Sequence, residues 1–397
     1  MTGKKRGPRK GLIIRLVAVL GVFALIASAC GDDDDAAETT AQETTTSAEA
    51  GDAGVLAGVC PDPVVMQLDW EPEAEHGGLY ELVGDGYTID TATKRVRGPL
   101  VASGGVDTGV DVEIRIGGNA VGFQQTGSLM YQDTDIFLGM IRLVEAMEFH
   151  QDLPVVAVFA MFEKSPFAVY WDPETYPDVE TIADLKDEGV VIMLGRPDSF
   201  QDYWLARGIM DESQMDLSDM GKPAAFIGHN GEWAEAGFAT AEPFLYEFEV
   251  PEWGRPVRVQ LIHDTGWEEY FQAMAVRTED LETYSECLEL LVPILQQGMV
   301  DFYANPGPTT DLILELVDAY DTGWIYTQPG AEYSIAKQLE LGIASNGDNG
   351  YIGDFDADRV TGLYDLVGEV TEIDVSGLDP SSVFTNQFID ESIGLGG

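Results

Sequence analysis

Short apolar runs alternate with amphipathic segments along most of the chain. Four of these runs predict buried strands: VVMQLDW, DVEIRIGG, PVVAVFAMF and VVIMLG, which begin at residues 64, 111, 154 and 190. Segments with a helical period lie between and after them, such as EHGGLYELVG and DSFQDYWLARGIM. Strands and helices in alternation predict an α/β fold, with mostly parallel sheets flanked by helices and joined by right-handed crossovers.

A middle block of strands and helices lies between strand-like segments near residues 159 and 270. We therefore expect two lobes: residues 62–164 and 266–397 form lobe I, and residues 165–265 form lobe II. The chain would cross between them twice. A crevice between two lobes, beyond the carboxyl ends of the strands, is a favoured place for a small ligand.

The N-terminus reads as an export signal followed by a tether. The basic segment MTGKKRGPRK precedes the apolar stretch LVAVLGVFALIASA, which is too short to span a membrane comfortably. Small residues then precede Cys30, so residues 1–29 are typical of a bacterial lipoprotein signal, and Cys30 is the expected lipid anchor. An ordinary secretory signal cleaved nearby is the alternative. Residues 30–61 are acidic and Thr-rich, and we expect a disordered tether.

The charge of the chain excludes some classes of partner. It has 21 Lys and Arg against 70 Asp and Glu, a net charge of −49, and loss of residues 1–29 would make it −55. Such a body repels nucleic acid and anionic lipid surfaces. Since the acidic residues are spread along the chain, they indicate a solvated surface more than a ligand site.

Two remaining features could carry cysteine or metal chemistry. Cys60 and Cys287 either form a disulfide in an oxidising compartment or stay as two buried thiols. The segment DFDADR alternates aspartates like a calcium loop, but it lacks the glycine and glutamate that such a loop requires. We expect a helix to begin there instead.

One motif links the chain to a known family. LDWEPEAEHGGLY (residues 68–80) resembles the opening motif of ABC-transporter substrate-binding proteins for thiamine-pyrimidine precursors and for nitrate, sulfonate and taurine. EAGFATAEPFLYE, GYIGDFDADRVTGL and VFTNQFID agree with that group. The resemblance implies the two-lobed periplasmic-binding-protein type II fold, an ABC permease and ATPase as partners, and no cofactor. Residues 88–110 depart from the pattern and predict an inserted loop.

Candidate ligand-binding residues lie where the predicted strands end. In lobe I, Trp70 can stack on a heteroaromatic ring, His76 can bond a ring nitrogen, and Gly77 can let a ligand approach a helix N-terminus. In lobe II, Glu242 favours a ligand with N–H donors or positive charge. The other candidates are Ser165, Arg196, Ser199, Phe200, Tyr203 and Thr240. Each could instead serve packing or capping.

These features predict a monomeric, lipid-anchored solute-binding protein on the outer face of the cytoplasmic membrane. Its expected ligand is a small heteroaromatic compound such as a pyrimidine or thiamine precursor. Arg196 keeps open a sulfonate, taurine or nitrate ligand. A sensing lipoprotein is a further alternative, as is an enzyme resembling the fungal pyrimidine synthases. Those synthases carry a Cys-rich motif and an active-site lysine, whereas this sequence has no Cys cluster and no Lys in its opening motif.

Overall fold

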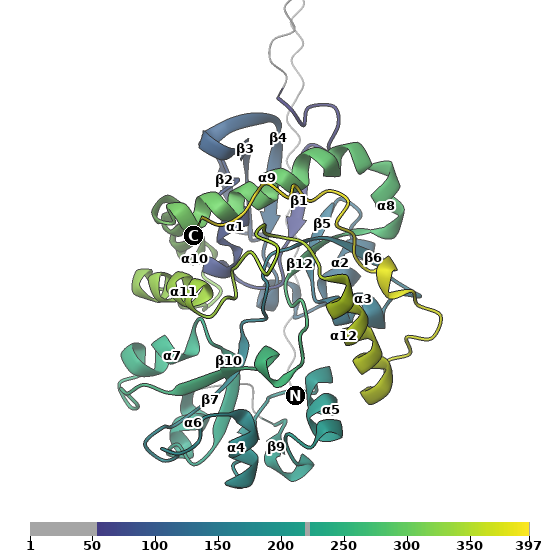
Figure 1. Cartoon of the computed structure of the whole chain (residues 1–397). Coiled ribbons are helices and arrows are strands. Elements are labelled where there is room, and N and C mark those ends of the chain that lie inside the picture. The colour runs from purple at the N-terminus through teal and green to yellow at the C-terminus, as the bar shows by residue number, and fades with distance from the viewer. Residues whose placement is uncertain (1–53, 219–222, 397) are drawn as a thin grey trace, which may run out of the picture. The chain divides into compact units, whose positions relative to one another are not determined.

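Two sheets organise the chain, and a computed structural model describes residues 54–218 and 223–396 of it (Figure 1). The first sheet has the strand order β2-β3-β4-β1-β5-β12-β6. Its strands are β1 (Val64–Gln67), β2 (Thr88–Asp90), β3 (Arg95–Ala102), β4 (Val106–Arg115), β5 (Leu138–Ile141), β6 (Val155–Ala160) and β12 (Ala273–Arg277). We call the part of the chain built on this sheet the first lobe.

The second sheet has the order β11-β7-β10-β8-β9, and the part built on it is the second lobe. Its strands are β7 (Phe167–Trp171), β8 (Ile192–Met193), β9 (Met215–Asp216), β10 (Ala234–Phe238) and β11 (Arg258–Leu261). The chain enters this sheet after β6 and returns to the first sheet with β12. Its principal helices are α4 (Ile182–Asp187), α5 (Ser199–Arg207), α6 (Pro223–Gly228) and α7 (Glu242–Phe244).

Apolar side chains on both faces of the first sheet are covered by helices. Alternate residues of β1 point to opposite faces: Met66 joins the core beneath α9, and Val65 joins the core beneath α2, α3 and α12. The helices of this lobe are α1 (Gly77–Tyr80), α2 (Thr126–Gln132), α3 (Leu143–Glu148), α8 (Thr278–Thr283), α9 (Ser285–Ala304), α10 (Gly307–Tyr320), α11 (Gln328–Glu340) and α12 (Ala357–Val370). The α/β prediction is confirmed.

Strand direction differs from the prediction. Only β4-β1-β5 and β10-β8-β9 are parallel runs, and the strands β2, β3, β6, β7, β11 and β12 pair antiparallel. Both sheets are therefore mixed rather than mostly parallel. β2, β3 and β4 form a meander, in which consecutive strands run antiparallel. Next to the two crossings, β12 pairs antiparallel with β5 and β6, and β7 pairs antiparallel with β10 and β11.

The predicted inserted loop at residues 88–110 is wrong. These residues form β2, β3 and the first half of β4, and they extend the first sheet at its edge. Val96 and Leu100 bury their side chains on one face, as a period-two strand requires. The reversal between β3 and β4 uses Gly104 and Gly105, whose φ angles of 73° and 76° favour glycine.

The ordered body begins earlier than the predicted tether end at residue 61. Leu56 is fully buried, and its N–H donates to the carbonyl of Thr108 at 2.9 Å. Cys60 and Cys287 form a disulfide with their Cα atoms 4.9 Å apart. Residues 54–61 therefore pack on the meander and on α9. The predicted signal peptide, the predicted lipid anchor Cys30 and the rest of the predicted tether lie outside the described residues.

Two smaller expectations concern the surface. Asp356 caps α12 by accepting from the N–H of Arg359 at 2.8 Å, so the predicted helix start at DFDADR is confirmed. In the part of the chain that the structure describes, no group of His, Cys, Asp and Glu is placed to hold a metal ion. No described helix is long and apolar enough to cross a membrane.

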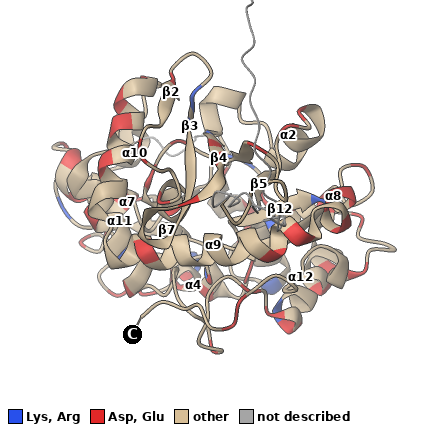
Figure 2. Ribbon diagram, turned by 90° about the horizontal axis from the view of Figure 1, so that it is seen from above, with Lys and Arg blue, Asp and Glu red and all other residues tan. Residues whose placement is uncertain are grey.

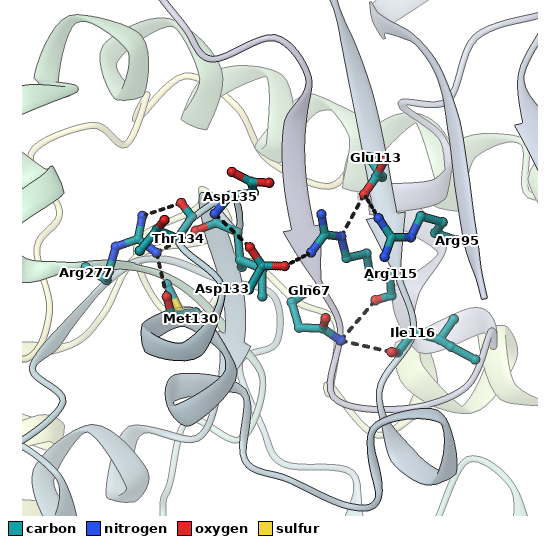
Figure 3. Close-up of polar contacts among 11 residues, drawn as sticks. Gln67, Arg95, Glu113, Arg115, Ile116, Met130, Asp133, Thr134, Asp135 and Arg277 are labelled. Carbon is teal, nitrogen blue, oxygen red and sulfur yellow. Dashed lines mark hydrogen bonds and ion pairs between the residues drawn. The ribbon is translucent and has the colours of Figure 1, made fainter. Parts of the chain in front are cut away.

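Acidic side chains dominate the surface, and several of the few arginines are held in ion pairs. Asp and Glu lie on most of the helices in Figure 2. Figure 3 shows Arg115 between Glu113, at 2.7 Å, and Asp133, at 2.8 Å, with Arg95 bonded to the same Glu113 at 2.9 Å. These contacts tie β3 and β4 to the loop after α2.

Candidate ligand-binding site

The opening motif follows the carboxyl end of β1, which lies between parallel neighbours β4 and β5. The chain turns there through the 3-10 helix η1 (Ala74–His76) into α1. The N–H of Ala74 donates to the Tyr326 hydroxyl at 2.9 Å, which fixes the turn against the segment before α11. This is the edge of an α/β sheet at which ligands commonly bind.

Trp70 is half-buried in a group of aromatic rings. Its ring lies 5.9 Å from that of Phe123 and 6.2 Å, edge-on, from that of Trp324. Gly118 has a φ of 55° and sits under the Trp70 ring, where a Cβ atom would come within 3.1 Å of it. Phe123 is 58% exposed. The Trp70 ring is thus supported by neighbours and remains partly accessible, as a stacking platform must be.

His76 supports the turn instead of forming a ligand wall. It is fully buried, and its Nε2 lies 3.0 Å from Oδ1 of Asp69. Gln272, just before β12, donates to the same carboxylate at 3.3 Å. His76 therefore orients Asp69, the residue before Trp70, and any effect it has on a ligand passes through that carboxylate.

Gly77 has a packing role. Its N–H donates to the carbonyl of Ala74, so it is not free for a ligand. A Cβ atom on Gly77 would lie 2.2 Å from the ring of Phe302 on α9. Gly78 is also packed too closely for a side chain, because a Cβ atom there would lie 2.2 Å from the sulfur of Met299. The glycine pair lets α1 approach α9 closely, which corrects the expectation that Gly77 faces the ligand.

Glu242 lies just after β10, at the start of α7. One of its carboxylate oxygens accepts from the N–H of Phe238 at 2.6 Å. Burial raises the pKa of this carboxyl to about 7. Thr240 is 1% exposed, and its hydroxyl has no hydrogen-bond partner among the described residues. Ser165, also buried, accepts from the N–H of Phe167 at 3.2 Å and shapes the first crossing.

The charges of two carboxylates of the opening motif, Glu73 and Glu75, interact with that of Glu242 in the second lobe. Burial raises the pKa of Glu73 well above its ordinary value, and the charges of Glu75, Asp69 and Glu242 raise it further. Glu75 acts on Glu242 in the same direction. Glu73 and Glu75 were not among the predicted site residues, although the run EPEAE lies between Trp70 and His76, which were.

Three phenylalanines form the floor between the crossings. Phe167, Phe238 and Phe271 have ring centroids 5.5 to 6.1 Å apart, and they come from β7, β10 and the segment before β12. Only structure reveals this set, because the three residues are far apart in sequence and none belongs to the opening motif. The set lies beside Glu242, whose carboxylate accepts from the N–H of Phe238, and beside Arg142, whose guanidinium is 4.9 Å from the Phe271 ring centroid.

Phe200 and Tyr203 are core residues, which corrects their prediction as wall residues. Phe200 is 1% exposed and packs against Trp204 with ring centroids 4.8 Å apart. Tyr203 donates its hydroxyl to the carbonyl of Thr265 at 2.9 Å and packs on Trp267. The inner face of α5 therefore holds the helix to the lobe.

Arg196 and Ser199 line a different hollow. It has a volume of about 1120 Å³ and lies among α3, the start of α5 and the segment after α12. Trp70, His76 and Glu242 are not among its lining residues. The sequence-derived candidates thus divide into two groups: those around Trp70 and Glu242, and those around Arg196.

Comparisons with known proteins establish the fold. No family model and no curated protein matches the chain. A solved structure from Bordetella bronchiseptica RB50 matches with a TM-score of 0.50 and 13% identity, covering 83% of this chain and 96% of that chain. The periplasmic aliphatic sulphonate binding protein SsuA from Escherichia coli matches with a TM-score of 0.49 and 11% identity, covering 78% and 86%.

A Candida albicans protein, described as having the generic periplasmic binding protein fold, matches with a TM-score of 0.46 and 12% identity, covering 83% of this chain and 98% of that chain. The two sheets and their flanking helices give the chain a two-lobed α/β architecture, as the sequence predicted. At these identities the likeness concerns the fold and leaves the ligand open.

Proposed function

We propose that the protein is an extracytoplasmic solute-binding protein of an ABC importer that closes its lobes around a small heteroaromatic ligand. One observation carries the proposal: Trp70, half-buried and partly accessible, follows the same strand as Glu73, whose charge interacts with Glu242 of the other lobe. A flat ring can stack on tryptophan, and ring or amino N–H groups can donate to carboxylates. Pyrimidines resembling thiamine precursors have both features.

The remaining parts of the proposal concern partners and location. We expect an ABC permease and ATPase to receive the ligand, and the binding protein to act as a monomer without a cofactor. Lipidation of Cys30 would hold it at the outer face of the cytoplasmic membrane, because two acyl chains suffice for stable attachment. Mass spectrometry of the N-terminal peptide from membranes should find a diacylglyceryl group on Cys30. An unmodified N-terminus at another residue would indicate simple secretion instead of membrane anchoring.

The hollow around Arg196 supports a second candidate, an anionic ligand such as a sulfonate, taurine or nitrate. Arg196 is exposed there, and Ser199 opens α5. Seven carboxylates line the same hollow, however: Glu145, Glu148, Asp152, Asp198, Asp202, Glu372 and Asp374. They would repel an anion, so we favour the site at Trp70.

A thermal-shift screen tests the proposal on the purified protein. Ligand at a hundred times its dissociation constant should add about 2.7 kcal/mol, a rise in melting temperature of a few degrees. We expect the rise with pyrimidines or flavins and not with taurine, alkanesulfonates or nitrate. Trp70→Ala should abolish the rise and Glu242→Gln should reduce it, while Phe248→Ala, at an exposed ring of the second lobe, should leave it unchanged.

The opposite pattern would identify the second candidate. A shift only with sulfonates or nitrate, lost in Arg196→Ala and kept in Trp70→Ala, would place recognition in the hollow beside α5. Genomic adjacency to permease and ATPase genes would separate import from sensing.

A further inference from the structure

The site at Trp70 gathers negative charge from both lobes. Glu73 and Glu75 belong to the turn after β1, and Glu242 to the start of α7. Their charges interact, since Glu242 raises the pKa of Glu73 and Glu75 raises that of Glu242. Asp69 and Glu71 add to the repulsion on Glu73 from the first lobe, and Glu235 adds to that on Glu242 from the second.

The described side chains supply little positive charge to balance this set. Lys94 interacts with Glu71 alone among these carboxylates and donates to the carbonyl of Tyr320. His76 bonds to Asp69. Within residues 54–218 and 223–396, no ion pair joins Glu73, Glu75 or Glu242 to a Lys or Arg. Glu75 is buried, and Glu73 and Glu242 are half-buried. Partly desolvated carboxylates without a cation are costly, so the arrangement calls for one from outside.

Unpartnered polar atoms in the same region point to a ligand independently of charge. Glu75 is 3% exposed, and its Oε2 has no hydrogen-bond partner among the described residues. The Thr240 hydroxyl, two residues before Glu242, likewise has none, and neither does Oε1 of Gln272, whose amide binds Asp69. All three side chains are more than nine-tenths buried. The oxygens of Glu75 and Gln272 are acceptors and lack a donor, and the Thr240 hydroxyl can accept as well as donate, so one ligand donor group could satisfy any of the three.

We infer that the ligand is an organic cation, and that its protonated amino or amidinium group binds between Glu73 and Glu242 and thereby holds the lobes together. This inference rests on the proposed function and specifies its ligand class. Repulsion between the carboxylates of the two lobes opposes closure when the site is empty. A cation converts that repulsion into two attractions, so it binds the closed form more strongly than the open form, which is the condition for shifting the equilibrium.

A matched pair of probes tests the charge. An aminomethyl-aminopyrimidine is cationic at neutral pH, and its hydroxymethyl counterpart has nearly the same shape without the charge. Isothermal titration should give about tenfold or more tighter binding of the cation, the gain expected for charge-assisted hydrogen bonds. Small-angle scattering should show a smaller radius of gyration with the cation than with the neutral probe at the same concentration.

Two substitutions and one control locate the effect. Glu73→Gln and Glu242→Gln should each reduce the preference for the cation, and the double substitution should remove it. Glu289→Gln changes an exposed glutamate on α9 and should leave the preference intact. Unchanged circular dichroism and a cooperative melting transition would show that the variants fold.

The outcomes separate this inference from the proposed function. Equal affinity for both probes, unchanged in the variants, would overturn the cation inference and leave heteroaromatic binding in place. Binding of neither probe, together with a thermal shift from a sulfonate or nitrate, would overturn both.

Discussion

Glu242 combines a half-buried carboxylate with a place just after a strand, and the combination makes folding stability depend on pH. Its pKa is raised to about 7, from an ordinary value of 4.5. Between these values the folded state holds a proton that the unfolded state releases. The contribution of Glu242 to stability is therefore present below about pH 4.5 and is lost as pH rises through 7.

Glu242→Gln should remove this dependence. Gln can still accept from the N–H of Phe238, so the local hydrogen bond survives. Relative to the parent protein, we expect the variant to gain about 2 kcal/mol in free energy of unfolding between pH 5 and pH 8. Urea denaturation at both pH values measures the difference. A gain that is the same at both would mean that Glu242 is ionised throughout.

Among single residues, sequence reasoning succeeded where a strand end fixes the position. Trp70 and Glu242 follow β1 and β10, as predicted, and their contact with a ligand stays a prediction. It failed where packing decides orientation: Phe200 and Tyr203 lie on α5, and the inward face of so short a helix is set by its neighbours. The cluster of Phe167, Phe238 and Phe271 could not be predicted from the sequence, because only the folded chain brings these residues together.

At the scale of elements, the Cys60–Cys287 disulfide links the N-terminal segment to α9. The bridge spans 227 residues of sequence and joins residues next to the first strand to a fully buried position on α9. Closing so long a loop removes much of the entropy of the unfolded chain. Sequence left this pairing open, because the approach of α9 to residues 54–61 depends on the tertiary fold.

Replacing both cysteines by alanine should lower the free energy of unfolding by about 2–5 kcal/mol. Guanidinium denaturation of the two proteins, without reductant, measures the loss. Ligand affinity should stay the same, because the bridge lies on the first lobe away from Trp70 and Glu242. Reduction should lower the free energy of unfolding of the parent protein by the same amount and leave that of the double variant unchanged. Such a result would assign the effect to the disulfide bond itself.

The fold at the level of the elements was largely predictable, and the exceptions have physical causes. Buried runs such as VVMQ and PVVAVFA became β1 and β6, since nothing but a sheet interior accommodates them. The meander at residues 88–110 was predicted as a loop because it departs from the family pattern. β3 nevertheless pairs with both β2 and β4, and the register shift between Pro99 and Val101 accommodates the proline.

At the scale of the whole molecule, Arg359 joins the two crossings between the lobes. Its guanidinium donates to the carbonyls of Glu163, on the first crossing, and of Glu268 and Glu269, on the second. It also pairs with the Glu163 carboxylate at 3.0 Å and lies 3.8 Å from the Tyr270 ring centroid. Arginine can make these contacts together because its donors form a rigid, planar fork.

Arg359→Lys keeps the charge and loses the fork, so it should loosen the crossings. We expect a loss of about 2–3 kcal/mol in free energy of unfolding and a faster ligand dissociation rate, because closure then depends on crossings that are less well fixed. Stopped-flow dissociation measures the rate. The matched control is Arg207→Lys, at a more exposed pair with Glu369 that joins α5 to α12. If both variants release ligand at the parent rate, lobe closure is independent of the Arg359 contacts, and the clamp serves stability alone.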